Sequence, residues 1–286
     1  MDAKFWLIQT FNGVSYGALL FLLASGLTLI FGVMRIVNLS HGAYFLLGGY
    51  VALTVMKYTG SWLLALPVAA LAIAVLGLIV ERIFLRPLGF DPLRQVLLTV
   101  GFAFLFQQAA LDIWGGDNLI IQPPPALSKS VVVGGLHLPL YRIFMIALAA
   151  AIGLAIWFAM ERTRMGAMVR ATVDDAEMAR GVGIDTSRVS MFIFALGAFL
   201  AALGGVIGGA FLGVYPGLDF EVLPIAFAVV IIGGMGSLAG AAIGSMLVGL
   251  ADNFGKALFP EVAYFSLYAP MVLILAMKPT GLLGRE

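Results

Sequence analysis

The chain has 286 residues, of which 62% are hydrophobic and only 11% are charged, and its formal net charge is +1. Typical soluble domains are about 45–50% apolar with glycine included and about 25% charged, so a soluble enzyme and a disordered protein are both excluded. The small net charge argues against a nucleic-acid partner, and the lack of cysteine excludes disulfides, thiolate metal sites and cysteine nucleophiles.

Nine apolar segments are candidates for membrane-spanning helices, because a bilayer core of about 30 Å needs roughly 20 apolar residues. The segments are continuous rather than alternating, which favours helices over the strands of a barrel. The sequence therefore predicts an all-α, polytopic transmembrane bundle in a single domain, residues 1–286. The seventh and eighth segments are short, and one span broken at 233–237 is the alternative. The segments are 11–33, 41–57, 62–80, 95–113, 140–160, 189–213, 218–233, 237–253 and 263–277.

The positions of Lys and Arg predict the orientation of the bundle. With nine spans, 11 of the 16 basic residues share the side of the 81–94 loop and 5 lie on the other side. The positive-inside rule then places the N-terminus outside and the C-terminus in the cytoplasm. Eight spans would change the balance to 10 against 6, so charge favours nine spans only slightly. The inner set is Arg35, Arg82, Arg86, Arg94, Arg162, Arg164, Arg170, Arg180, Arg188, Lys278 and Arg285, and the outer set is Lys4, Lys57, Lys129, Arg142 and Lys256.

Polar residues between the first two segments have two interpretations. Asn38 or Ser40 can cap the second helix by accepting a hydrogen bond from a backbone N–H group. Together with His41, they can instead line a translocation path. A metal site is not expected, because His41 has no second ligand beside it and His137 falls in a predicted outer loop.

Two amides, Gln107 and Gln108, lie inside the fourth segment, with Asp112 at its outer end. Buried amides in lipid need hydrogen-bond partners and often mark transport pathways, although bonds between helices are the commoner explanation. We therefore add both glutamines to the candidate translocation path.

Acidic residues near the segment ends are predicted to be solvated. Asp219 and Glu221 fall in a short outer loop, and Asp252 stands beside Asn253 at the outer end of the eighth segment. Because no predicted span carries a carboxylate at its centre, a proton relay lacks its usual parts, which disfavours a proton-driven secondary transporter.

Glycines repeat every four residues in two segments, which places them on one helix face where backbones can approach closely. The same glycines could line or gate a pathway. Residues 234–239 formally match the dinucleotide fingerprint G-x-G-x-x-A, but they lie between two apolar runs and so predict a turn at the membrane edge. The glycines are Gly204, Gly205, Gly208, Gly209 and Gly213 in the sixth segment, and Gly236, Gly240 and Gly244 in the eighth.

The longest outer loop, 114–139, contains two ordered features. Three consecutive prolines, 123–125, favour polyproline II, and residues 131–138 read as a hairpin with Gly134 and Gly135 as the turn. Such a loop could dock a partner or cover the bundle.

The inner loop, 161–188, contains ten charged residues. Thr172 followed by Asp175 resembles a capping box, and Gly181 and Gly183 can end the helix that it begins. The sequence therefore predicts a short helix outside the membrane.

This helix, 173–180, is either an ordinary part of a solvated loop or the element through which a cytoplasmic, energy-supplying subunit drives a conformational change. The chain has no Walker A motif and no catalytic constellation, so a separate subunit must bind any ATP that drives transport. The chain is thus expected to need no cofactor of its own. The expected coupling residues are Thr172, Asp175, Ala176, Glu177, Met178, Ala179, Arg180 and Gly181.

Three stretches, 26–42, 175–184 and 232–244, resemble permease subunits of ATP-binding-cassette importers for branched-chain amino acids. The first stretch is fairly specific, and the third also resembles sugar permeases. The resemblance implies a bacterial inner-membrane protein that pairs with a second, homologous permease. It also implies two cytoplasmic ATPase subunits, a periplasmic binding protein, a periplasmic loop at 114–139 and a cytoplasmic coupling helix in 161–188.

Other functions remain open at this point. Similar permeases import urea, short-chain amides or aromatic acids. A self-sufficient secondary transporter should show inverted repeats and ionisable residues at the membrane centre, and neither is clear. A membrane enzyme lacks a catalytic cluster.

The predicted orientation can be tested with single cysteines, because the chain contains none. A cysteine at Ser128 should react with an impermeant thiol reagent added outside intact cells, and one at Thr186 should not. The opposite labelling pattern would overturn the orientation.

Overall fold

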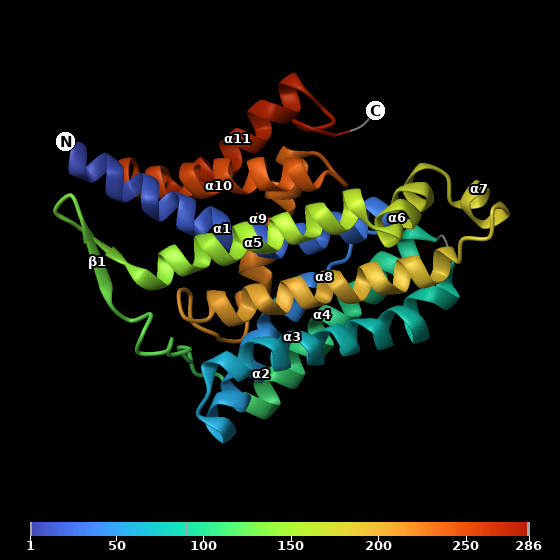
Figure 1. Cartoon of the computed structure of the whole chain (residues 1–286), viewed down its shortest axis with the longest axis horizontal. Coiled ribbons are helices and arrows are strands. Elements are labelled where there is room, and N and C mark those ends of the chain that lie inside the picture. Colours follow the sequence, from blue (N-terminus) through green and yellow to red (C-terminus); the bar gives the residue numbers. More distant parts are fainter. Residues whose placement is uncertain (1, 90, 285–286) are drawn as a thin grey trace.

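The structure is a computed structural model that describes residues 2–89 and 91–284, so Arg285 of the predicted inner set lies outside the described residues. Helices run along one long axis, with a small hairpin near one end and two short helices at the other (Figure 1). We name these the hairpin end and the loop end. The prediction of an all-α, polytopic bundle is confirmed.

The α-helices are α1 Ala3–Met34, α2 His41–Thr59, α3 Trp62–Ile79, α4 Pro92–Trp114, α5 Leu140–Arg162, α6 Arg164–Asp174, α7 Ala176–Gly181, α8 Thr186–Gly208, α9 Leu218–Gly233, α10 Leu238–Leu258 and α11 Ala263–Met277. The other elements are the π-helix η1 Val80–Leu85, the 3-10 helices η2 Arg86–Leu88 and η3 Pro260–Val262, and the strands β1 Ser130–Val133 and β2 Leu136–Pro139.

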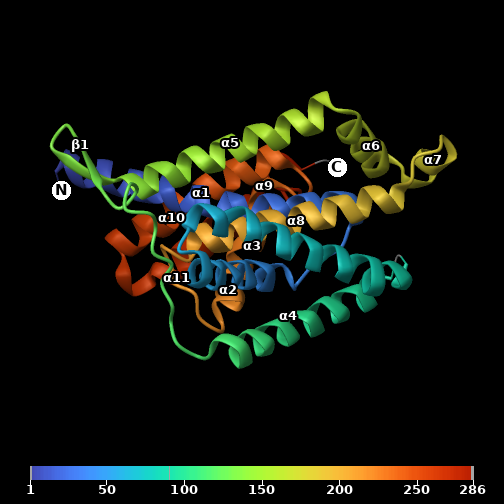
Figure 2. The same ribbon diagram turned by 60° about the horizontal axis from the view of Figure 1, so that its bottom comes forward.

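Two helices form the centre of the bundle. The apolar stretches of α1 and α8 are 78% and 72% buried within the chain, whereas those of α4 and α5 are 22% and 17% buried. Figure 2 shows α4 and α5 at opposite edges of the bundle, with α1 and α8 between them. A helix that is apolar on all sides suits either the core or lipid, so this division depends on packing and not on composition.

The nine predicted segments all form helices, but not all can cross a membrane. Among the described residues, six helices are long and apolar enough: α1, α3 with its extension to Leu88, α4, α5, α8 and α10. The helices α2, α9 and α11 fall short, because α2 contains polar residues and the other two have only 16 and 15 residues. The expectation that some of the segments are short is therefore confirmed, and six of the described helices have the length and composition of full spans.

The helices α9 and α10 form an antiparallel hairpin. Gly240 packs against Gly233, and Gly244 packs one turn away against Val229. A single span broken at 233–237 is excluded by this arrangement. The helix α1 begins at the hairpin end (Figure 1), and the segment after α11 packs against the end of α9, where the Leu282 and Leu283 N–H groups donate to the Ile232 and Gly233 carbonyl oxygens.

Close backbone contacts occur wherever the central helices cross. A Cβ atom built on Gly26 of α1 would lie 2.6 Å from the Gly197 carbonyl oxygen of α8. A Cβ on Gly48 of α2 would lie 2.5 Å from the Ala202 Cα of α8. Since only glycine fits at such distances, these residues set how near the helices can come.

Three of the predicted packing glycines lie outside the helices to which they were assigned. Gly209 and Gly213 follow the end of α8, and Gly236 precedes α10 with a φ of +84°. Gly236 still makes a close contact, because a Cβ there would lie 3.2 Å from the Gly32 Cα of α1. Gly236 therefore both forms the turn before α10 and contacts α1.

The outer-loop prediction of a hairpin is confirmed. Strands β1 and β2 pair antiparallel, with Val133 opposite Leu136 and Gly134 and Gly135 in the turn. Before the hairpin, Leu119 pairs with Val214 through backbone hydrogen bonds of 2.9 and 2.7 Å. This bridge ties the loop after α4 to the loop after α8.

The close contact between α9 and α10 predicts that adding one methyl group at Gly240 lowers the stability of the protein. Gly240→Ala should destabilise the protein by about 1–3 kcal/mol, as overpacking typically does, because the new Cβ would overlap the Gly233 carbonyl. Gly101→Ala is the matched control, since a Cβ at this helical glycine meets nothing within 4 Å. Thermal denaturation of the solubilised protein measures the difference. Equal melting temperatures for the two variants would contradict the packing argument.

Candidate functional site

The first candidate region is the break between α1 and α2, residues 35–40. Asn38 and Ser40 are fully buried, and the Asn38 Oδ1 atom accepts hydrogen bonds from the Ser40 hydroxyl at 2.7 Å and the Ser40 N–H at 3.1 Å. The Thr99 hydroxyl of α4 accepts a bond from the Leu39 N–H at 3.2 Å. These bonds satisfy a backbone that leaves its helix inside the bundle. Ser40 occupies the N-cap position of α2 without a side-chain capping bond, so Asn38 organises the turn.

His41 begins α2 and is also fully buried. Its Nε2 atom lies 2.9 Å from the Leu23 carbonyl oxygen of α1. Among the described residues, its Nδ1 atom and the Asn38 Nδ2 atom have no hydrogen-bond partner. Asn38, Ser40 and His41 are thus buried where the break meets α1, α2 and α4.

The N-terminal ends of α2 and α9 meet beside the break. The Asp219 carbonyl oxygen of α9 contacts Gly42 of α2. Asp219 is only 2% exposed, and among the described residues no side chain pairs with its carboxylate, which lies beside backbone N–H groups at the start of α9. The prediction that Asp219 is solvated is therefore wrong. Helix N-termini carry partial positive charge, and the two that converge here favour a carboxylate electrostatically.

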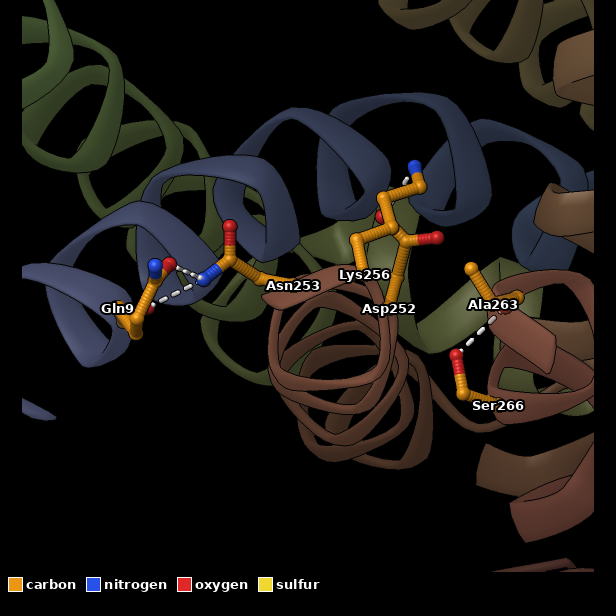
Figure 3. A network of polar contacts seen from close by, with 6 residues as sticks. All are labelled: Gln9, Asp252, Asn253, Lys256, Ala263 and Ser266. Atoms are coloured by element: carbon orange, nitrogen blue, oxygen red, sulfur yellow. Dashed lines mark hydrogen bonds and ion pairs between the residues drawn. The ribbon is translucent and has the colours of Figure 1, made fainter. Parts of the chain in front are cut away.

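Asp252 was also predicted to be solvated, and the structure corrects this. Its side chain is 7% exposed and accepts a 2.7 Å bond from the Lys256 ammonium group. Beside it, the Asn253 Nδ2 atom donates to the Gln9 carbonyl oxygen at 2.8 Å and to Gln9 Oε1 at 2.6 Å (Figure 3). This network joins α10 to the start of α1 and needs no ligand.

Glu221 is exposed, as predicted, and accepts a 2.8 Å hydrogen bond from the Tyr215 hydroxyl. Burial, together with this bond, raises the pKa of Tyr215 to about 12. The Tyr215 hydroxyl therefore remains a hydrogen-bond donor at neutral pH.

An apolar groove of about 460 Å³ opens beside the break, between α4, α9 and α11. Its wall is almost entirely hydrocarbon. Leu39 enters it from the break, so the groove and the buried polar turn are neighbours. Composition alone could not separate this groove from the lipid-facing surface, because both are apolar. The residues used below are Leu39, Val100, Phe104, Phe220, Phe227 and Met271.

The two candidate glutamines do not join the break residues. Gln107 is half-buried and follows Val100 and Phe104 on one face of α4, one turn beyond the groove. Gln108 is exposed and donates a 2.9 Å hydrogen bond to Asp112. Both follow groove-lining residues by one turn of α4, but of the two only Gln107 is partly buried.

The loop between α5 and α8 contains two helices where the sequence predicted one. Thr172 lies buried inside α6 and donates to the Met168 carbonyl oxygen at 2.8 Å, so it does not cap the next helix. Asp175 is the N-cap of α7, and its Oδ1 atom accepts bonds from the N–H groups of Glu177 and Met178, both at 2.9 Å. The predicted capping box and the helix start at 173 are therefore wrong.

The end of α7 agrees with the prediction that Gly181 and Gly183 end the helix. Gly181 is the last helical residue, and Gly183 takes the left-handed conformation with a φ of +89°. Ala179 is buried, whereas Met178 and Val182 are 65% and 71% exposed. Glu177 and Arg180 are exposed as well. At the loop end, α7 thus presents apolar and charged side chains together.

Comparison with known proteins identifies the chain. A family model described as the permease component of branched-chain amino acid transport systems matches residues 9–277. The chain belongs to this permease family. The LivH permease of a high-affinity branched-chain amino acid transport system in Escherichia coli K12 is 32% identical, over 98% of this chain and 96% of LivH. The BraD permease of Pseudomonas aeruginosa is 29% identical over the same shares.

Family membership confirms the resemblance seen in the sequence and makes the chain a multi-pass transport permease. The chain is also similar to LivM of Escherichia coli K12, at 26% identity over 92% of this chain and 67% of LivM. LivH and LivM carry the same transport-system name, which supports a paired permease arrangement. The stretches that carried the resemblance form the α1–α2 break, the helix α7 and the α9–α10 turn.

Proposed function

We propose that this permease translocates branched-chain amino acids across the bacterial inner membrane as one subunit of an ATP-driven importer. The apolar groove between α4, α9 and α11 carries the proposal. Its hydrocarbon wall suits an aliphatic side chain, while the neighbouring break offers buried polar groups at the same depth. Urea and short-chain amides lack the apolar surface that such a wall would bind.

In this proposal, a second, homologous permease covers the groove and completes the translocation path. The groove is open along its side, so one chain supplies only part of a wall around a solute. The similarity to both LivH and LivM supports a heterodimer. A periplasmic binding protein would deliver the amino acid at the hairpin end, where the loop at 114–139 lies.

In the same proposal, a pair of cytoplasmic ATPase subunits contacts α7 and supplies the energy for transport. The positive-inside rule places the loop end in the cytoplasm, with the N-terminus outside and the C-terminus inside. The exposed side chains Met178 and Val182 suit an apolar pocket on a partner, and Glu177 beside them suits a basic rim. ATP would bind to the partners, so the permease needs no cofactor.

The groove predicts a change in substrate size selection. Phe227→Trp should reduce uptake of leucine several-fold and that of the smaller valine less, because the larger ring narrows the groove. Phe158→Trp is the control, since Phe158 lies on the outer face of α5 and is 59% exposed. Uptake is measured in proteoliposomes containing the complete complex. An equal loss for both amino acids, or in both variants, would place the path elsewhere.

The exposed face of α7 predicts how the ATPase attaches. Glu177→Arg should weaken co-purification of the ATPase subunits, because reversing one partner of a desolvated interface pair typically costs about 2–5 kcal/mol. Asp117→Arg is the matched control: an exposed acid reversed in the loop after α4, on the hairpin-end side of the bundle. Unchanged ATPase binding and unchanged uptake in Glu177→Arg would show that α7 is only a solvated loop.

A further inference from the structure

A second cavity, of about 150 Å³, lies where α7 meets the bundle. We name it the joint cavity. Side chains from η1, α4, α6, α7 and α8 and from the end of α1 surround it, so it touches both the extramembrane loop and the spans. Its wall combines apolar, hydroxyl and charged groups. The lining residues used here are Ile36, Glu81, Arg86, Gln95, Arg180 and Ser190.

Glu81 is the unusual member of this wall. It is 2% exposed, and its Oε2 atom has no hydrogen-bond partner among the described residues. A buried polar atom is costly unless it is hydrogen-bonded, so this oxygen favours the approach of a further donor.

The backbone around Glu81 is also unusual. Val80–Leu85 forms a π-helix, in which the Arg86 N–H donates to the Glu81 carbonyl oxygen. Glu81 and Leu85 are buried together, while residues 82–84 between them are exposed. Single π-turns are rare and frequently occur at functional sites.

Two arginines of the joint cavity could pair with Glu81. Arg86, like Arg82, lies in the same segment and already interacts electrostatically with Glu81, so a pair with it would not link Glu81 to another element. Arg180 belongs to α7, where its Nε atom donates to the Ala176 carbonyl oxygen at 3.2 Å. Since α7 has only six residues and is too short to be stable alone, contacts with its neighbours determine its position.

The joint cavity is connected to the apolar groove by the break itself. Ile36 lines the joint cavity, and Leu39, three residues later, lines the groove. The helix α4 makes a second connection, with Gln95 at the joint cavity and Val100 at the groove. A displacement at the joint cavity would therefore reach the groove through two short segments.

We propose that Glu81 is a positioning residue that receives Arg180 when the ATPase presses α7 toward the bundle. The resulting ion pair links α7 to η1, which continues α3, and so transmits the motion to the break and the groove. This inference rests on the proposed function, because it requires α7 to be the ATPase contact.

Charge exchange tests the inference in the complete complex. Glu81→Gln and Arg180→Gln should each lower the solute imported per ATP hydrolysed by about fivefold or more, the lower range of coupling between sites. Glu81 lies outside the proposed ATPase contact, so Glu81→Gln should keep normal ATPase co-purification. The Gln/Gln double variant should be no worse than either single variant. The exchanged pair Glu81→Arg with Arg180→Glu should restore much of the coupling.

Further results distinguish a wrong partner for Glu81 from a wrong proposed function. If Glu81→Arg with Arg86→Glu restores coupling and the Arg180 exchange does not, Arg86 is the partner and the inference is wrong. Additive losses in the Gln/Gln variant would overturn it as well. If the wild-type chain binds no ATPase, the proposed function itself fails, and that result is visible before any Glu81 variant is made.

Discussion

Direct contact between helix backbones holds the centre of this bundle together, and the positions of the other elements depend on it. Lipid offers no hydrophobic force to drive helices together, so they associate through close packing and a few polar bonds. The helix α1 touches α8 where Gly26 meets Gly197, and it touches α10 where Gly17 meets the Ser245 backbone. A side chain at either glycine would separate the helices.

The rigid centre allows two helices to start inside the bundle. In hydrocarbon, each backbone polar group needs a partner within the protein. Asn38 and Thr99 supply partners at the break before α2. The converging ends of α2 and α9 place partial positive charge around Asp219, which accounts for a buried acid without a basic partner. The apolar groove then opens against this polar region, so aliphatic and polar surfaces occur at one depth.

The loop end and the groove are parts of one arrangement. Residues 36–39 reach from the joint cavity to the groove, and α4 borders both. The hairpin end is held differently, by the Leu119–Val214 bridge and by the Gln9–Asn253 contact. At the loop end, the short, partly exposed helix α7 contacts the interior of the bundle. At the hairpin end, hydrogen bonds between segments distant in the sequence hold the elements together.

Much of this protein follows from the sequence alone. Composition and the length of the apolar runs determined an all-α membrane bundle, and Gly134–Gly135 between a valine run and an alternating Leu-His-Leu run determined the hairpin. The residues around the break, α7 and the α9–α10 turn determined the family, because a motif of consecutive residues can be read directly from the sequence. Only the tertiary structure decided which helices are central, because α1 and α5 are both apolar on all sides. It alone showed that α2 and α9 begin inside the bundle and that Asp219, Asp252 and Glu81 are buried. The reason is physical: burial and pairing depend on which distant backbone comes near, and the spacing of residues along one helix does not contain that information.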